Sequence, residues 1–156
     1  MKAKRLLQLS LGMILCAACI RGTLMHHFEH IDPEGWDRSD TLFFQLPPIT
    51  HEGRFQFDVN MRYTNSFPYK GIWMVAETRL NHPVAARRDT LYIEAADERG
   101  IPVGDGLNLL QLSTPLYSLH LEPGQEGTLR LYHLMRPETM PGIREIGIKV
   151  TEASPN

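Results

Sequence analysis

The sequence has few cysteines, little net charge and no long hydrophobic segment. Its two cysteines, Cys16 and Cys19, both precede residue 20, so the rest of the chain cannot form an internal disulfide. The formal net charge of −2 lacks the basic excess that nucleic-acid-binding proteins usually carry. The longest apolar run, Leu6–Ala18, is about 13 residues, whereas a membrane-spanning helix needs roughly 20. These absences argue against a disulfide scaffold, a nucleic-acid partner and a permanent membrane-spanning helix.

Motifs for catalysis and for metal or cofactor binding are also missing. The chain has no Gly-x-Ser-x-Gly elbow, no Walker-type phosphate loop and no His-Glu-x-x-His helix. Asp97 and Glu98 could form an acid–base pair, but neighbours in a strand face opposite sides and neighbours in a turn are solvated. Residues 26–30 include three histidines and a glutamate that could bind a transition metal, but their spacing matches no defined site. We therefore predict that the chain has no catalytic residue, metal site or cofactor, and that the protein is not an enzyme.

The N-terminus has the layout of an export signal. Three basic residues among the first five precede the apolar run, and small Ala17 and Ala18 stand directly before Cys19. Residues 15–19 resemble a bacterial lipobox, with Cys16 where that motif more often has Leu, Val or Ile. The alternatives are an ordinary secretory signal and a buried N-terminal strand. We predict a signal peptide over 1–18 and acylation of Cys19, which would anchor the protein in a membrane.

Most of the chain alternates between apolar and polar residues with a period of two, as half-buried β-strands do. The clearest case is 54–63, and further strands are predicted over 41–46, 72–78, 90–95, 116–121, 128–135 and 146–150. Frequent turn residues separate these stretches, and almost nothing repeats with a helical period. The pattern predicts an all-β fold, a single antiparallel β-sandwich of the jelly-roll or Ig-like type with about 7–8 strands.

The predicted domain covers 41–152. A tether and entry segment over 19–40 runs up onto it, and a short tail over 153–156 follows. Trp36 is expected to mark where the tether docks onto the core, because a tryptophan is seldom left free in a linker. The strands over 128–135 and 146–150 are predicted to form a closing pair, joined by the loop Arg136–Arg144 at the edge of the sheet. Prolines and glycine in that loop block a helix, so it is a candidate surface for a partner.

Four segments of the chain, in order, carry a resemblance to a known family. Together with the lipobox they resemble the gliding motility lipoprotein GldH family of the Bacteroidetes, over nearly the entire mature chain. The segments are Arg62-Tyr63-Thr64-Asn65 leading to Phe67-Pro68-Tyr69; Asp89-Thr90-Leu91 followed by Ala96-Asp97-Glu98; Gly100 through Gly104-Asp105-Gly106; and His133-Leu134-Met135-Arg136 followed by Pro141-Gly142-Ile143 and Gly147.

The resemblance implies an envelope lipoprotein associated with the gliding machinery, in a family with no known catalytic motif. Our hypothesis is a non-catalytic component that contacts other envelope proteins, with Tyr69, Trp73 and Arg136 as candidate partner-binding residues. The alternative is a glycan-binding lipoprotein module, which needs exposed coplanar aromatic rings beside a polar groove. No small-molecule substrate is expected.

The residues after Cys19 bear on the location. Ile20–Thr23 lack the acidic run that follows the cysteine in surface-exported lipoproteins of the phylum to which the resemblance points. They also lack an aspartate directly after the cysteine, which is an inner-membrane retention signal in other lipoproteins. By this resemblance, the periplasmic face of the outer membrane is favoured over the inner membrane and the cell surface.

Overall fold

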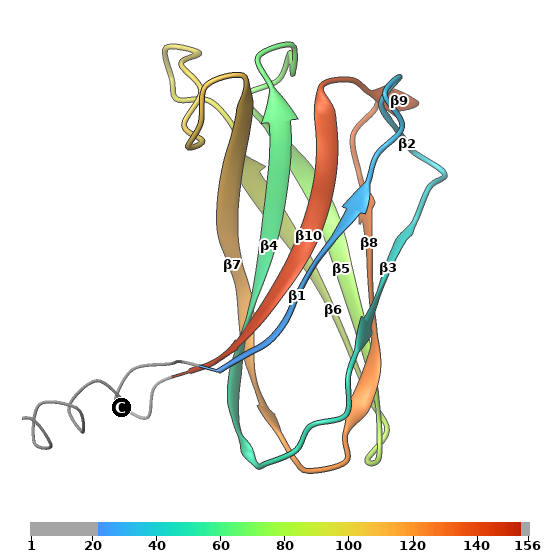
Figure 1. Ribbon diagram of the computed structural model, residues 1–156. Helices are drawn as coiled ribbons and strands as arrows, with labels where there is room; N and C mark the ends of the chain where they lie inside the picture. Colours follow the sequence, from blue (N-terminus) through green and yellow to red (C-terminus); the bar gives the residue numbers. More distant parts are fainter. Residues whose placement is uncertain (1–21, 154–156) are drawn as a thin grey trace, which may run out of the picture.

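Alternating apolar and polar residues build ten strands in the computed structural model, which describes residues 22–153 (Figure 1). Within this part of the chain the structure contains no helix. The strands are β1 (Thr23–His30), β2 (Trp36–Asp37), β3 (Leu42–Leu46), β4 (Gly53–Thr64), β5 (Gly71–Asn81), β6 (Ala85–Glu94), β7 (Leu109–Leu121), β8 (Glu126–His133), β9 (Thr139–Met140) and β10 (Ile143–Glu152).

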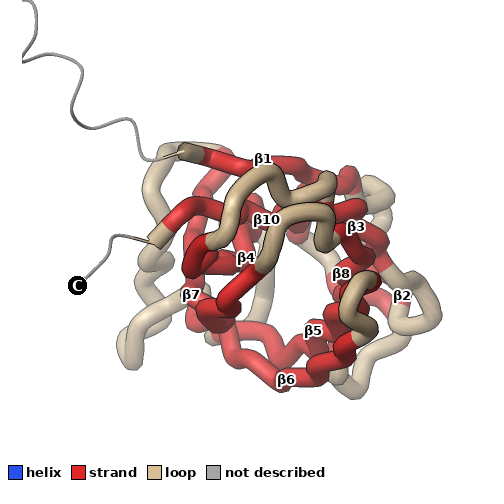
Figure 2. The backbone as a smooth tube through the Cα atoms, turned by 90° about the horizontal axis from the view of Figure 1, so that it is seen from below, coloured by secondary structure: helices blue, strands red, loops and turns tan. Residues whose placement is uncertain are grey.

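Eight of these strands form two antiparallel four-stranded sheets, in the orders β1-β10-β4-β7 and β3-β8-β5-β6. Viewed from below, the two sheets face each other (Figure 2). The two-residue strands β2 and β9 form a separate pair. Only β5 and β6 are neighbours both in the sequence and in a sheet, and this order of strands is that of a jelly roll. The predicted all-β sandwich is confirmed.

The core lies between the inner faces of the two sheets. Alternate residues of β4 from Phe55 to Tyr63 are buried, as their period predicted. The hydroxyl groups of Thr78 and Tyr117 hydrogen-bond to each other across the interior, and burial raises the pKa of Tyr117 to about 12. Other buried residues of both sheets complete the core, among them Phe44, Ile72, Met74, Leu129, Leu131, Ile146, Ile148 and Val150.

The predicted tether contains a strand. Thr23–His30 forms β1, which pairs with β10 from Thr23 opposite Thr151 to His30 opposite Glu145. Phe28 packs on Gly147, where an added Cβ atom would lie 2.6 Å from the phenyl ring, so this close contact depends on the glycine. The first strand is thus stabilised by a residue that is distant in the sequence, and the interpretation of 23–30 as tether is wrong.

Trp36 does dock onto the core, as predicted, and is 1% exposed. Its indole ring meets the ring of His133 edge-on, with centroids 5.2 Å apart. Its backbone pairs with Met140 in the short β2–β9 ladder. The segment between β1 and β3 is therefore held against the sandwich at its entry to the second sheet.

The predicted closing pair does not form. β8 pairs with β3 and β5, whereas β10 pairs with β1 and β4, so the two strands belong to opposite sheets. The connection between them crosses from one sheet to the other and contains β9. Gly142 in this connection has φ +85° and packs directly on the backbone of Phe67, which leaves no room for a side chain.

Three further strands, β5, β6 and β7, are longer than predicted. β7 begins at Leu109 and includes Pro115, because an edge strand tolerates the missing N–H and a register shift opposite Phe57 and Asp58 accommodates the ring. β5 and β6 extend through most of the predicted polar loop and leave only residues 82–84 as the turn between them.

Candidate partner-binding surface

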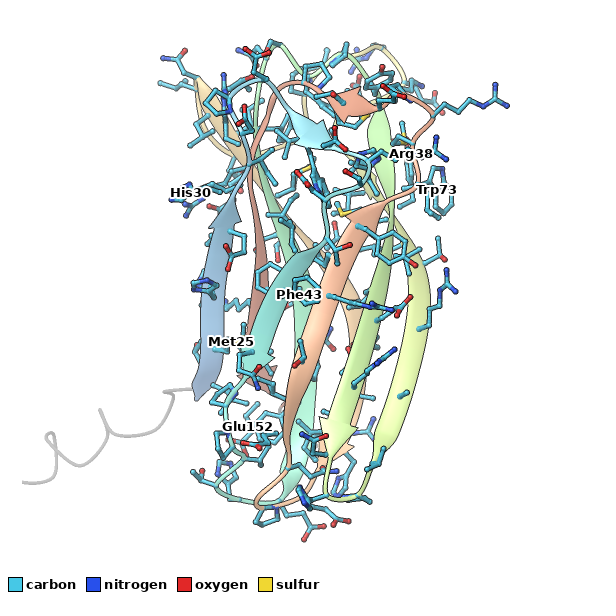
Figure 3. All side chains as sticks on the ribbon, turned by 90° about the vertical axis from the view of Figure 1, so that its right-hand side faces the viewer. Met25, His30, Arg38, Phe43, Trp73 and Glu152 are labelled. Carbon is cyan, nitrogen blue, oxygen red and sulfur yellow. The ribbon has the colours of Figure 1, made fainter. Side chains whose placement is uncertain are left out.

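An exposed aromatic patch lies on the outer face of the β3-β8-β5-β6 sheet. Trp73 is 49% exposed, because it alternates along β5 with the buried residues Ile72 and Met74. Its indole packs on the ring of Tyr92 from β6, with centroids 4.9 Å apart and 44° between the ring planes. The backbone of Leu134 donates a 2.8 Å hydrogen bond to the carbonyl of Trp73. We call Trp73, Tyr92 and Leu134 the Trp73 patch, and Figure 3 labels Trp73 on this face.

The Trp73 patch is at the end of the sandwich opposite to the start of β1. β1 begins at the end of the sandwich where β10 finishes. Because the strands are antiparallel, β5 and β7 start at the other end, and β6 and β8 finish there (Figure 1). We call this other end the far end. Most of the large exposed hydrophobic residues in the described chain are here: Trp73, Tyr92, Ile101, Val103, Leu107, Leu109 and Leu134. Contiguous exposed apolar residues mark interaction sites, and the packed rings of Trp73 and Tyr92 form such a group.

The other two predicted contact residues are placed differently. Tyr69 is half-buried and packs edge-on against Phe67, with centroids 5.8 Å apart, so it extends the core. Arg136 is exposed and follows Leu134 by two residues on the chain that leaves the patch. The structure therefore brings Trp73 and the segment before Arg136 together. Cys19 lies outside the described residues, and all of these binding roles stay predictions.

A row of charged residues crosses the same outer face below the Trp73 patch. Arg130 and Arg88 flank Glu77, whose side chain is only 14% exposed. Arg130 Nε donates to Glu77 Oε2 at 2.8 Å, the Tyr132 hydroxyl donates to Oε1 at 3.0 Å, and Arg88 Nε lies 3.6 Å from Oε1. The hydrogen bonds from Arg130 are the main cause that holds the pKa of Glu77 below its ordinary value.

Several residues of this face were not identified from the sequence. Tyr92 and Arg88 alternate with buried Leu91 and Ile93, a pattern that predicts an exposed position but not its neighbours. The register places them beside Trp73 and Glu77. These contacts depend on strand pairing, which single-sequence alternation does not specify.

The residues considered for metal binding or catalysis do not converge. Successive residues of β1 point to opposite faces, so the histidine cluster of 26–30 is divided between the two sides of the sheet. No group of three or more His, Cys, Asp or Glu residues in the range 22–153 is placed to hold a metal ion. Asp97 Oδ1 accepts hydrogen bonds from the backbone N–H groups of Arg99 and Ile101, so it shapes its turn.

Comparison with known proteins identifies the family. The family model described as GldH lipoprotein matches residues 23–150, from the start of β1 nearly to the end of β10. The chain belongs to the GldH lipoprotein family. The gliding motility lipoprotein GldH of Flavobacterium johnsoniae is 19% identical over 152 residues, which cover 92% of this chain and 94% of that protein. Membership implies a lipid-anchored protein of the cell envelope with partners there.

The solved structures that match this chain do so at low identity. A family GH115 4-O-methyl-α-glucuronidase matches 87% of this chain with a TM-score of 0.43 and 12% identity, but the match covers only 18% of that enzyme. A family 35 carbohydrate-binding module from Clostridium thermocellum matches 83% of this chain and 90% of its own, with a TM-score of 0.40 and 14% identity. Similarity at these levels supports no inference about catalysis or binding. Within 22–153 there is no helix long and apolar enough to cross a membrane.

We expect a buried histidine to make the stability of this GldH-family domain depend on pH. His133 is 2% exposed, and burial lowers its pKa from the ordinary value of 6.5. The unfolded chain therefore binds more protons than the folded one below this value, so stability is fully present above it and falls as the pH drops toward the folded pKa. We expect the urea concentration at the unfolding midpoint to decrease as the pH is lowered from about 7.5 to about 5.5. Tryptophan fluorescence measures this unfolding.

His133→Gln should flatten this pH dependence, because glutamine does not titrate. The matched control is His120→Gln, which replaces an exposed histidine and should keep the slope. Burial also lowers the pKa of His26, which would leave a small residual slope of the same sign. An unchanged slope in His133→Gln would show that His133 does not control it.

Proposed function

We propose that the β-sandwich is a non-catalytic docking module, which contacts other envelope proteins of the gliding machinery through the Trp73 patch. The observation that carries the proposal is the exposed Trp73–Tyr92 pair with Leu134 beside it, at the far end of the domain. Tryptophan, tyrosine and arginine are the residues that most often dominate the energy of protein interfaces, and this face presents Trp73, Tyr92 and the arginines Arg79, Arg88 and Arg130.

The position of the patch fits a lipid anchor on Cys19. Thr23, the first residue of β1, follows Cys19 by four positions, a distance that the chain spans with at most about 14 Å. The end where β1 begins would thus stay near the membrane, while the far end would point away from it. We place the domain on the periplasmic face of the outer membrane, because residues 20–23 lack the features that resemble export or retention signals.

The local chemistry of the patch favours a protein partner over a glycan. A flat platform for sugar stacking needs coplanar rings, whereas the planes of Trp73 and Tyr92 are inclined by 44°. The neighbouring groups are apolar: Leu134 is 49% exposed, and the sulfur of Met135 lies 3.5 Å from the backbone nitrogen of Trp73. A protein surface that presents apolar side chains would cover these groups well.

The double variant Trp73→Ala/Tyr92→Ala tests the proposal. The full-length lipoprotein is cross-linked in cells and then pulled down with its envelope partners. We expect the double variant to recover these partners at least about tenfold less efficiently than the wild type, because truncation of an interface aromatic residue commonly costs 2 kcal/mol or more of binding free energy. Quantitative mass spectrometry measures the recovery. Arg136→Glu should reduce it as well, whereas Tyr69→Ala should mainly lower stability because Tyr69 packs on the core.

The matched control is Val84→Ala, which changes an exposed apolar residue that lies outside the patch, in the turn between β5 and β6. Partner recovery should stay at the wild-type level. Undiminished recovery with a folded Trp73→Ala/Tyr92→Ala protein would overturn the docking role of the patch. Loss of bound envelope polysaccharide in place of protein would instead support the glycan-binding module.

A further inference from the structure

We propose that the arginine-rich part of the same outer face binds a short acidic segment of the partner protein, centred on Arg79. This inference rests on the proposed function, because it specifies the chemistry of the segment that docks on the β3-β8-β5-β6 sheet. It concerns a different set of side chains from the Trp73 patch, so the two can be tested separately.

Arg79 stands in a hollow that the strand register creates. Its neighbours across the sheet are Thr128 on β8 and Ala86 on β6, both of which have short side chains. The adjoining row contains the longer side chains of Phe43, Arg130, Glu77 and Arg88. Hollows therefore open on both sides of Arg79, and they are lined by Phe43, Asn81, Thr128, Arg87, Arg88 and Arg130.

The charges around this hollow leave arginine groups available. Glu77 is the only carboxylate in the row, and it is already bonded to Arg130, Tyr132 and Arg88. Among the described residues, no carboxylate lies within 4.0 Å of the Arg79 side chain. Arg88 is 66% exposed and presents further N–H groups to solvent. Guanidinium groups bind carboxylates with two parallel hydrogen bonds, so the hollow is complementary to aspartate or glutamate.

The distribution of charge favours a protein segment over a polyanion. Glu126 is in register with Asn81 at one end of the face, and Glu94 is in register with Gly71 at the other. A uniformly charged acidic polysaccharide laid along the strands would meet these two carboxylates, whereas a protein segment can concentrate its acidic residues at the centre. Phe43, 59% exposed, adds an apolar contact beside the hollow.

The two parts of the face are close enough for one segment to contact both. Trp73 and Arg79 are six residues apart on β5, which corresponds to about 20 Å along an extended strand. Figure 3 shows Trp73 and Phe43 on this side of the molecule. An extended segment of about seven residues, acidic at one end and apolar at the other, would reach from the hollow to the Trp73 patch.

Photo-cross-linking in cells tests this inference with the full-length protein. p-Benzoylphenylalanine replaces Phe43, and mass spectrometry identifies the captured partner peptide. We expect the captured peptide to contain at least two Asp or Glu residues within about five positions of the cross-link. Arg79→Glu should lower the cross-linking yield about tenfold or more, because it removes a charged hydrogen bond. Exchange of the captured acidic residues for arginine should restore the yield with Arg79→Glu.

The matched control is Arg54→Glu, which reverses an exposed arginine on β4 of the other sheet and should leave the yield unchanged. Thermal unfolding verifies that both variants are folded. A captured segment without acidic residues, a polysaccharide product, or a yield insensitive to Arg79→Glu would overturn the inference. If the Arg79 test fails but the Trp73→Ala/Tyr92→Ala variant still loses its partners, the proposed docking function stands without the acidic segment. If that variant also retains its partners, both the docking function and the acidic segment are wrong.

Discussion

Replacement of Ile148 with aspartate is expected to abolish folding of the domain. Ile148 is 1% exposed at the centre of β10, between Val59 on β4 and His27 on β1. A carboxylate at this position would be buried among the apolar side chains of Phe44, Phe57 and Leu129, a change that typically destabilises a domain by more than about 4 kcal/mol. A total stability of about 5–15 kcal/mol is common, so a loss of this size would leave a domain at the lower end of that range with almost no stability. Far-UV circular dichroism and thermal unfolding measure the effect.

Thr151→Asp is the matched control for this prediction. Thr151 belongs to the same strand but alternates onto the outer face, where a carboxylate stays hydrated, so its effect should remain within about 0.5 kcal/mol. Ile148→Val, which removes one buried methylene group, should cost about 1 kcal/mol. Wild-type thermal stability of Ile148→Asp would show that the side chain is not in the core.

Replacement of Cys19 with serine is expected to remove the lipid anchor. Serine has no thiol to receive a diacylglyceryl group, and each buried acyl CH₂ contributes about 0.8 kcal/mol to membrane attachment. Intact-mass analysis of the extracted wild-type protein should give a chain that begins at Cys19 and carries acyl chains. The Cys19→Ser protein should lack this acyl mass and leave the membrane fraction, unless 1–18 is retained as an anchor.

Cys16→Leu provides the control, because it introduces the residue more usual at that lipobox position and leaves Cys19 in place. Its mass should equal that of the processed wild type, since Cys16 is removed with the signal. A wild-type protein that retains residues 1–18 without acyl mass would contradict the lipoprotein signal in this chain, and membrane attachment would need another explanation.

The family assignment depends on features that are spread over the chain. The match extends from residue 23 to residue 150 and therefore includes β1, which the sequence analysis had assigned to a tether. The resemblance noted in the sequence used segments from residue 62 onward. At 19% identity to the Flavobacterium johnsoniae protein, order and spacing carry more information than any single motif.

The sequence by itself determined which residues face the core in most strands. Alternation is a local property, because successive side chains of a strand point to opposite sides whatever the strand pairs with. It correctly predicted the buried positions of β4 and β10 and the all-β class, whereas the burial of Trp36 was predicted from its residue type alone. The predicted N-terminal lipobox is equally local, as a motif of five residues.

Only the tertiary structure decided which strands are neighbours. In a jelly roll most consecutive strands alternate between sheets, so β8 and β10 separate although they are close in the sequence. The strand β1 packs against β10 because Gly147 has no side chain to collide with Phe28. The hollow at Arg79 exists because the side chains of Thr128 and Ala86 beside it are short. These arrangements arise from contacts between distant residues, because pairing and register depend on the partner strand and not on the period of either one.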